Sequence, residues 1–345
     1  MKRFFSDIAA NVALREQLGT EILASRLPHA YIIEGAKGSG KHTLAYRIAA
    51  ALSCQRKEEE SAPLPCMNCP SCKKILDGNS PDVITVHRED TASLGVDIIR
   101  EMRKDVWIAP NDTDFKIYLI EEAHLMNEQA QNALLLTLEE PPAYVFFLLL
   151  CETTSTLLET IRSRASTLHM EPVDKETMDR YLCEKSTEAR ALKASNPHEY
   201  YEMLATSDGC IGTALALLSP SARKPILEKR ERAREFVHLC SDRKSAFDTF
   251  RYINSLGARR ETVIQQLNVT LLCLRDLLLC KQADEPSLCF FAECEEAHNL
   301  AYRFTTPDLL RICSEVNEAV NRLKANANVK LTMTSLAVGA GMIQI

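Results

Sequence analysis

The stretch GAKGSGKHT, residues 35–43, decides the fold class, because it matches the phosphate-binding P-loop template G-x-x-x-x-G-K-[ST] at every position except the last. In that template the glycines let backbone N–H groups surround a phosphate, and the lysine reaches the β- and γ-phosphates. Gly35, Gly40 and Lys41 fit, whereas His42 replaces the hydroxyl that binds Mg²⁺. Imidazole is a poor ligand for this hard, oxygen-seeking ion. The stretch therefore predicts nucleotide binding more firmly than nucleotide hydrolysis.

Two further loop residues, Gly38 and Thr43, are expected beside the nucleotide. Thr43 carries a hydroxyl one position beyond the template's. A shift of one residue rotates a side chain by about 100° around a helix axis. We therefore do not expect Thr43 to replace the missing Mg²⁺ ligand.

The first 170 residues alternate between apolar runs of strand length and amphipathic runs of helical spacing. Strand, Gly-rich loop and helix follow one another at the P-loop, which is the context that the motif requires. Asn127 is a plausible N-cap, and Pro141-Pro142 ends the helix that follows it. We expect strands at 30–34, 83–87, 116–120 and 145–151, and helices at 41–54, 95–106 and 127–140. This pattern predicts a doubly wound α/β domain with a parallel sheet.

After about residue 172 the strand signal fades and helical patterns take over. We expect three parts: an α/β domain at 1–172, a small helical domain at 173–242 and a helical bundle at 243–345. The charged run EKRERARE at 228–235 alternates in sign, so we interpret it as a solvated helix face.

Length, charge and cysteine content set the broad class. The 345 residues carry a net charge of −6, which argues against a chain that binds nucleic acid alone through a broad basic face. No segment approaches the roughly 18 uninterrupted apolar residues of a membrane span, and no apolar signal segment opens the chain. We expect a cytoplasmic protein without membrane contact, whose thirteen cysteines are reduced thiols and metal ligands.

Four cysteines directly after the P-loop helix predict a metal site. Cys54 is followed by Cys66, Cys69 and Cys72 in CMNCPSC, two overlapping C-x-x-C turns. Four thiolates at this spacing can close tetrahedrally around Zn²⁺, and a closed shell of this kind is structural rather than catalytic. The alternative, four unrelated buried thiols, fits the spacing poorly.

Polar residues end two of the expected strands. Glu121 and Glu122 follow KIYLI, where a nucleotide hydrolase holds Mg²⁺ and orients the attacking water. Taken alone they could equally be exposed acids at a strand end. Thr153 or Thr154 follows the next strand, where a polar side chain could contact a γ-phosphate.

Arg164 follows a short expected helix that ends at Arg162. An arginine at this place could reach a neighbouring subunit and stabilise a phosphoryl transition state in trans. The alternative is an arginine that is merely solvated.

These segments together resemble the bacterial DNA polymerase III clamp-loader ATPases of the AAA+ class. The resemblance rests on LPHAYIIEGAKGSGKHTLA, the four-cysteine module, GVDIIREMRKDV and above all NALLLTLEEPP, and extends to LRDLLL and RLKANANVKL near the C-terminus. It implies an AAA+ nucleotide-binding domain with a zinc module, a helical lid and an oligomerising collar.

Three departures from the family's motor subunits, gamma and tau, favour the delta-prime type. The resemblance places a hydroxyl, an Asp-Glu pair and a sensor arginine where this chain has His42, Glu121-Glu122 and Gly212. The chain length also fits delta prime, since a tau-like chain would extend much further. The arginine of the family's Ser-Arg-Cys motif is kept as Arg164, although alanine follows it.

The resemblance thus implies a subunit that acts as scaffold within the polymerase holoenzyme and supplies Arg164 to a neighbour's ATP. Its partners would be gamma/tau and delta in a ring that loads a sliding clamp onto primed DNA, and its own ATPase would be weak or absent. Zn²⁺ is the expected structural cofactor, and ATP with Mg²⁺ remains possible. Two rivals stay open: an active gamma/tau-like ATPase that tolerates His42, and a zinc-dependent nucleic-acid adaptor.

Overall fold

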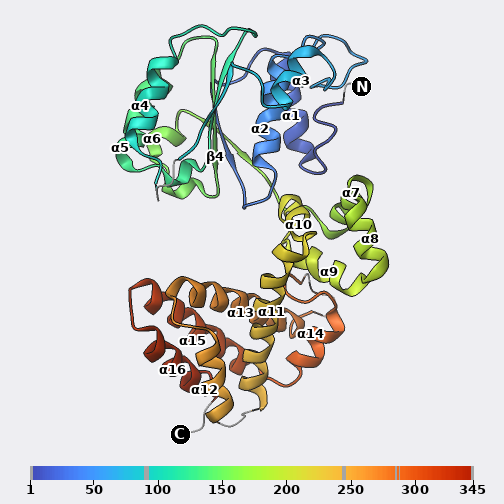
Figure 1. The fold of residues 1–345 in the computed structure, drawn as a ribbon, viewed down its shortest axis with the longest axis vertical. Helices are drawn as coiled ribbons and strands as arrows, with labels where there is room; N and C mark the ends of the chain where they lie inside the picture. Colours follow the sequence, from blue (N-terminus) through green and yellow to red (C-terminus); the bar gives the residue numbers. More distant parts are fainter. Residues whose placement is uncertain (1–2, 89–92, 243–245, 284–285, 287, 343–345) are drawn as a thin grey trace. The chain divides into compact units, whose positions relative to one another are not determined.

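The chain divides into two compact units. A computed structural model describes residues 3–88, 93–242, 246–283, 286 and 288–342. The first unit comprises Met1–Tyr181 with Cys210–Thr213, and the second Leu182–Gly209 with Ala214–Ile345 (Figure 1). The boundary expected near Asp242 falls at the end of a helix, and residues 243–245 after it lie outside the described ones.

A five-stranded sheet in the order β2-β3-β4-β1-β5 forms the centre of the first unit. Every neighbouring pair is parallel, so all carboxyl ends lie at one edge. The strands are β1 Ala30–Glu34, β2 Val83–Val86, β3 Lys116–Ile120, β4 Val145–Cys151 and β5 Ser166–His169. The parallel α/β class expected from the sequence is confirmed.

Helices cover both faces of this sheet (Figure 1). Alternate residues of β1 serve the two sides: Tyr31 and Ile33 pack with one core, Ala30 and Ile32 with the other. The first core takes its helices from α1 Val12–Leu23, α2 Lys41–Leu52 and α3 Pro70–Leu76. The second takes them from α4 Val96–Asp105, α5 Glu128–Glu139 and α6 Glu159–Arg162. Burial on both faces explains why the central strands are apolar almost throughout.

Most elements of this unit agree with the sequence expectation to within two residues. Asn127 caps α5 as expected, because its side chain accepts the N–H of Ala130 at 2.8 Å. The sequence patterns did not predict α1, α3 or β5. Two short 3₁₀ turns, η1 Ala123–Leu125 and η2 Thr154–Thr156, follow β3 and β4.

The described part of the second unit is helical. Its core surrounds α13 Arg260–Cys280, which packs against α11, α14 and α15. By length and composition alone α13 could cross a membrane, but half of its apolar window is buried in this core. The helices are α7 Lys175–Lys185 and α10 Ile211–Leu217, which belong partly to each unit, and α8 Thr187–Ser195, α9 Pro197–Thr206, α11 Pro220–Asp242, α12 Ala246–Ser255, α13, α14 Cys294–Ala301, α15 Thr306–Lys324 and α16 Val329–Gly339.

The interpretation of 228–235 as a solvated face is wrong for two of its arginines. Arg230 is buried and its guanidinium lies 4.7 Å from the ring centroid of Phe290. Arg234, one turn later, donates to Glu202 at 3.0 Å and contacts the same ring at 5.3 Å. A spacing of four residues puts both on one helix side, where an aromatic ring and a carboxylate replace the lost water.

The turn that leads into β3 is held by one buried carboxylate. Asp82 is fully buried and accepts backbone N–H bonds from Asn111, Asp112 and Thr113 at 2.6, 2.7 and 2.8 Å. Burial alone would raise the pKa of Asp82, but these three N–H donors outweigh burial and lower it. A carboxyl group with a lowered pKa stabilises the fold above its usual pKa, and this stabilisation is lost as the pH falls.

Asp82→Asn should therefore lower the free energy of unfolding at pH 7 by about 1–3 kcal/mol. The difference from the wild type should shrink below about pH 4, where the unfolded carboxyl group also binds a proton. Thermal unfolding followed by circular dichroism at both pH values measures this. Asp114→Asn, in the exposed part of the same turn, is the control. Equal melting temperatures of wild type and Asp82→Asn at pH 7 would contradict the assignment.

Candidate functional site

The carboxyl ends of β1, β4 and β3 bring the predicted nucleotide residues to one place. Because these strands are adjacent and parallel, the P-loop after β1 lies beside the segments that follow β3 and β4. Ligands of open α/β sheets bind outside this edge. The predicted P-loop residues, Glu121 and Thr154 are all found there, whereas Arg164 and the cysteines lie elsewhere in the unit.

The P-loop has its expected backbone. Gly38 and Gly40 have φ values of 81° and 96°, which side chains other than hydrogen disfavour. Lys41 is buried, and its Nζ donates to the carbonyls of Gly35 at 2.6 Å and Ala36 at 2.9 Å. Burial lowers the pKa of Lys41, opposed mainly by the charge of Glu152. The lysine ammonium thus contacts carbonyl groups of its own loop.

His42 pairs with Glu121, one of the two acids for which the sequence predicts a role in binding Mg²⁺ and orienting water. Its Nδ1 lies 3.2 Å from Oε1 of Glu121, and both side chains are partly exposed. In a hydrolase, a hydroxyl at the position of His42 and a carboxylate at the position of Glu121 would both bind Mg²⁺. In this chain the two groups contact each other. Thr43, the next residue of α2, is exposed.

Glu122 is directed into a different ion pair. Its Oε2 accepts the Nε–H of Arg88 at 2.7 Å, and its backbone is left-handed with a φ of 48°. The two neighbouring acids therefore have separate basic partners.

The threonine after β4 is held by a carboxylate that sequence analysis did not single out. Glu34 accepts the Thr154 N–H at 2.8 Å and its hydroxyl at 3.3 Å. The other oxygen of Glu34 lies 2.9 Å from Nδ1 of His169. Thr153 instead accepts the N–H of Ser155. The available signal was a charged residue ending the apolar strand AYIIE directly before the P-loop.

The segment Cys210–Thr213 contacts the P-loop within the first unit. The Gly212 N–H donates to the Gly38 carbonyl at 2.8 Å, and the Thr213 hydroxyl donates to the Lys37 carbonyl at 3.1 Å. A Cβ at Gly212 would lie only 2.9 Å from the Gly38 carbonyl oxygen and 3.1 Å from its Cα. The contact therefore requires glycine at 212, where the sequence resemblance implies an arginine in motor subunits.

Arg164 lies in the turn after α6, away from the P-loop contacts described above. Its Nη2 donates to Glu139 at 2.8 Å and its Nη1 to the carbonyl of Thr160 at 3.1 Å. The side chain is about one third exposed. The guanidinium is thus ordered on the surface of the first unit.

The four predicted cysteines converge on one buried cluster. Their sulfur atoms all lie within 4.8 Å of one another, and the Sγ atoms of Cys66 and Cys72 are 3.9 Å apart. A metal held tetrahedrally by bonds of about 2.3 Å, the zinc–thiolate length, spaces its sulfurs about 3.8 Å apart. The donor set therefore fits a metal ion. Its members are Cys54 after α2, Cys66 and Cys69 before α3, and Cys72 within α3.

Backbone N–H groups point at the sulfur atoms of two of these cysteines. The Cys69 N–H points at Cys66 Sγ and the Cys72 N–H at Cys69 Sγ, both at 3.4 Å. Burial would raise the pKa of Cys66, but N–H donors from Asn68 and Cys69 lower it to about 7. A thiolate is the form that binds metal.

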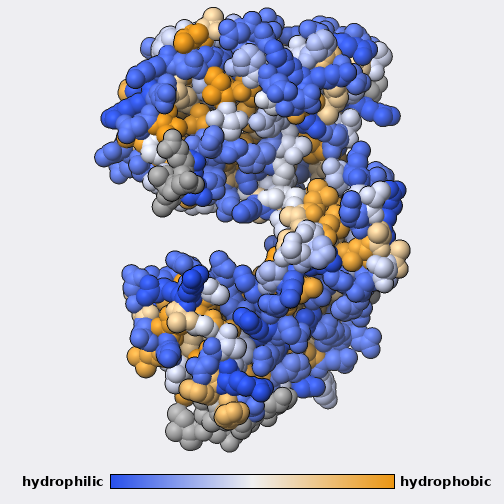
Figure 2. Space-filling model, viewed as in Figure 1, coloured by the Kyte–Doolittle hydropathy of each residue, from blue (hydrophilic) through white to orange (hydrophobic). Residues whose placement is uncertain are grey.

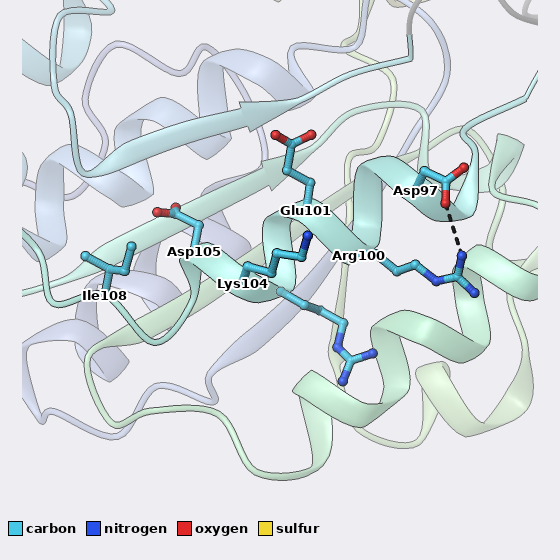
Figure 3. A pocket seen from close by; sticks show the side chains of 7 residues that line it. Asp97, Arg100, Glu101, Lys104, Asp105 and Ile108 are labelled. Carbon is cyan, nitrogen blue, oxygen red and sulfur yellow. Dashed lines mark hydrogen bonds and ion pairs between the residues drawn. The ribbon is translucent and has the colours of Figure 1, made fainter.

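A hollow of about 780 Å³ on the first unit lies along α4 (Figure 3). Both acidic and basic side chains line it, with Asp97 paired to Arg100 at 3.1 Å, and none of the predicted site residues is among them. The face drawn in Figure 2 is mostly hydrophilic, with small hydrophobic patches. Two exposed apolar residues, Trp107 and Ile108, follow α4.

Comparison with known proteins agrees with these observations. The family model described as DNA polymerase III, delta subunit, matches residues 11–174. The delta' subunit of DNA polymerase III from Bacillus subtilis is 28% identical over 323 residues, which cover 93% of each chain. The chain is thus similar to a DNA polymerase III delta' subunit over nearly its whole length.

Other DNA polymerase III subunits match over shorter segments. The tau subunit of B. subtilis is 32% identical over 217 residues, which cover 62% of this chain and 37% of that protein. The tau/gamma subunit of Haemophilus influenzae is 36% identical over 179 residues, 52% of this chain and 25% of the relative. This chain therefore spans only 25–37% of the length of these two relatives.

Among solved structures, a DNA polymerase III gamma-subunit-related protein from Thermotoga maritima aligns with 94% of this chain and 98% of its own. The sequence identity is 19% and the TM-score 0.46.

The Gly212 contact gives a prediction about the P-loop. Gly212→Ala should push the segment away from Gly38 and speed hydrogen exchange of the Gly212 amide by about tenfold or more, because that amide loses its acceptor. Mass spectrometry of peptides spanning 208–217 and 35–41 measures this. Gly95→Ala is the matched control, since its Cβ meets nothing within 4 Å. Unchanged hydrogen exchange in Gly212→Ala would show that the hydrogen bond from Gly212 to Gly38 does not form in solution.

Proposed function

We propose that this chain is a delta-prime-like clamp-loader subunit that acts as scaffold and contributes Arg164 to the ATP site of a neighbouring subunit. The pair between His42 and Glu121 carries the proposal. These two residues stand where a hydrolase has its Mg²⁺ ligands, and in this chain their side chains contact each other instead. The match to a delta' subunit over 93% of both chains supports it. The regions 173–242 and 243–345 would serve as lid and collar.

The remaining groups around the P-loop favour a site without turnover. Phosphoryl transfer depends on positioned charges that are free to meet the phosphate and its metal. Here Glu122 is paired with Arg88 and Thr154 with Glu34. Binding of a nucleotide would require Lys41 to leave its two loop carbonyls. Catalysis would further require His42 and Glu121 to separate and admit Mg²⁺.

An arginine offered in trans must be accessible and charged. Arg164 meets both conditions, since its side chain is about one third exposed and a guanidinium stays protonated in proteins. It stands in the Ser-Arg sequence that the family resemblance associates with this role. The proposed partners are gamma/tau and delta subunits, the proposed targets of the assembly are a sliding clamp and primed DNA, and the proposed location is the cytoplasm.

An active gamma/tau-like ATPase is the second candidate. Intact Gly35, Gly40 and Lys41 favour it, as does the 32–36% identity to tau and tau/gamma relatives. The two candidates differ in where ATP would be hydrolysed: at this chain's own P-loop, or at a neighbour's with Arg164 supplied in trans.

A reconstituted clamp loader distinguishes them. Arg164→Ala in this chain should lower the assembly's kcat for ATP by roughly tenfold or more, because transition-state charge loses a donor. Lys41→Ala should leave that rate within about twofold if the chain's own P-loop does no hydrolysis. Steady-state ATPase assays measure both, with gel filtration confirming intact assemblies. A large loss from Lys41→Ala and none from Arg164→Ala would favour the active ATPase instead.

We further propose that the cysteine cluster holds a structural zinc ion. All-cysteine sites are typical of Zn²⁺, and a closed shell leaves no position for substrate. The residues that would hold it are the four buried cysteines of the cluster.

The purified chain should then contain about one zinc per molecule, and Cys69→Ser should lose it together with part of its thermal stability, because metal binding is coupled to folding. Elemental analysis and a melting curve with and without a strong chelator measure this. Cys313→Ser, which changes a half-buried cysteine of the second unit, is the control. Full zinc content in Cys69→Ser, or iron in place of zinc, would refute the assignment.

A further inference from the structure

Two short hydrogen bonds and one long one, from Nη1 to the Ser163 hydroxyl at 3.5 Å, hold Arg164 within its own chain. Glu139, in the last turn of α5, accepts from Nη2 at 2.8 Å. The Thr160 carbonyl, one of those left over at the end of α6, accepts from Nη1 at 3.1 Å. A guanidinium has five N–H donors in a planar fork, so these two contacts fix its plane and leave donors for another ligand.

The backbone that carries this pair is fixed by other contacts. Gln131, buried within α5, donates to the Met126 and Thr156 carbonyls at 3.1 and 3.2 Å and accepts the Leu158 N–H at 2.7 Å. Leu138 and Ile161 are buried in the same core. The segment that leads into α6 is therefore anchored without Glu139.

The pair itself adds little to folding stability. Both side chains are partly exposed, 36% for Arg164 and 47% for Glu139. Exposed ion pairs contribute little, because solvent screens them and two long side chains lose rotamer freedom. What the pair does determine is which rotamer Arg164 adopts. That matters for a long side chain that must meet a phosphate outside its own subunit.

We propose that Glu139 is a positioning residue for Arg164: its carboxylate holds the guanidinium in the orientation that a neighbouring subunit's ATP requires. The inference rests on the proposed function, in which Arg164 acts in trans. Glu139 would thus affect ATP turnover only through its contact with Arg164. Loss of Glu139 should lower turnover by freeing the arginine, without weakening nucleotide binding.

Glu140 supplies a matched control from the same sequence. It is adjacent to Glu139 and has the same side chain, but its backbone has left the helix, with φ −136° and ψ 68°. Arg164 contacts Glu139 and not Glu140 among the described residues. A general effect of removing negative charge would therefore appear in both variants, whereas positioning appears only at Glu139.

The test measures kcat and KM for ATP of a reconstituted clamp loader that contains this chain. The wild type is compared with the single variants Glu139→Ala, Glu139→Gln, Glu140→Ala and Arg164→Ala, and with the double variant Glu139→Ala/Arg164→Ala. Glu139→Ala should lower kcat by roughly tenfold with KM unchanged, since loss of orientation affects the transition state. Glu139→Gln, which keeps an oxygen acceptor, should recover part of this loss, and Glu140→Ala should match the wild type. The double variant should be no slower than Arg164→Ala, because Glu139 acts only through Arg164.

The outcomes separate this inference from the proposed function. If Arg164→Ala lowers kcat but Glu139→Ala does not, or if the two losses multiply in the double variant, the positioning role is wrong and the finger role stands. If Arg164→Ala has no effect, both are wrong. Gel filtration and melting temperatures identify a structural cause: a Glu139→Ala chain that melts early or fails to assemble would overturn the positioning role as well.

Discussion

The parallel pairing of β3, β4 and β1 is the constraint on which the candidate site depends. Ile120 pairs with Leu149, and Leu149 in turn pairs with Ile32, so three strands end at nearly the same level. Segments from three distant parts of the sequence therefore begin side by side. A buried sheet fixes this register strongly, because a slip of one residue would turn every apolar side chain to the wrong face.

At that edge, the polar groups are paired within the chain. Lys41 contacts loop carbonyls, His42 contacts Glu121, and Thr154 contacts Glu34. Partly buried polar groups need such partners, since an unpaired one costs desolvation free energy. The pairing of His42 with Glu121 also opposes Mg²⁺ binding, because Glu121 would first have to leave His42. In the proposed function, the scaffold role and the absence of turnover would therefore have one physical origin.

Sequence patterns identified the long apolar strands, the helix after the P-loop, and the cysteine cluster, because each rests on local spacing. They did not give the partners that decide the chemistry. Glu34 and His169 end strands that are neighbours in the sheet but 135 residues apart in the chain, and no local pattern relates them. Likewise EKRERARE alternates in sign, yet two of its arginines pack against the ring of Phe290, which comes from elsewhere in the chain. The strand β5 was missed because STLH is short and half polar.

The cysteine cluster lies just beyond the opposite end of the helix that begins at the P-loop. α2 runs from Lys41 to Leu52, about 18 Å at 1.5 Å per residue, and Cys54 follows it. A metal bound to all four sulfurs would shield them from oxidation, whereas free thiolates are open to sulfenic acid and disulfide formation. A single helix, α2, thus connects the four sulfur atoms with the phosphate loop.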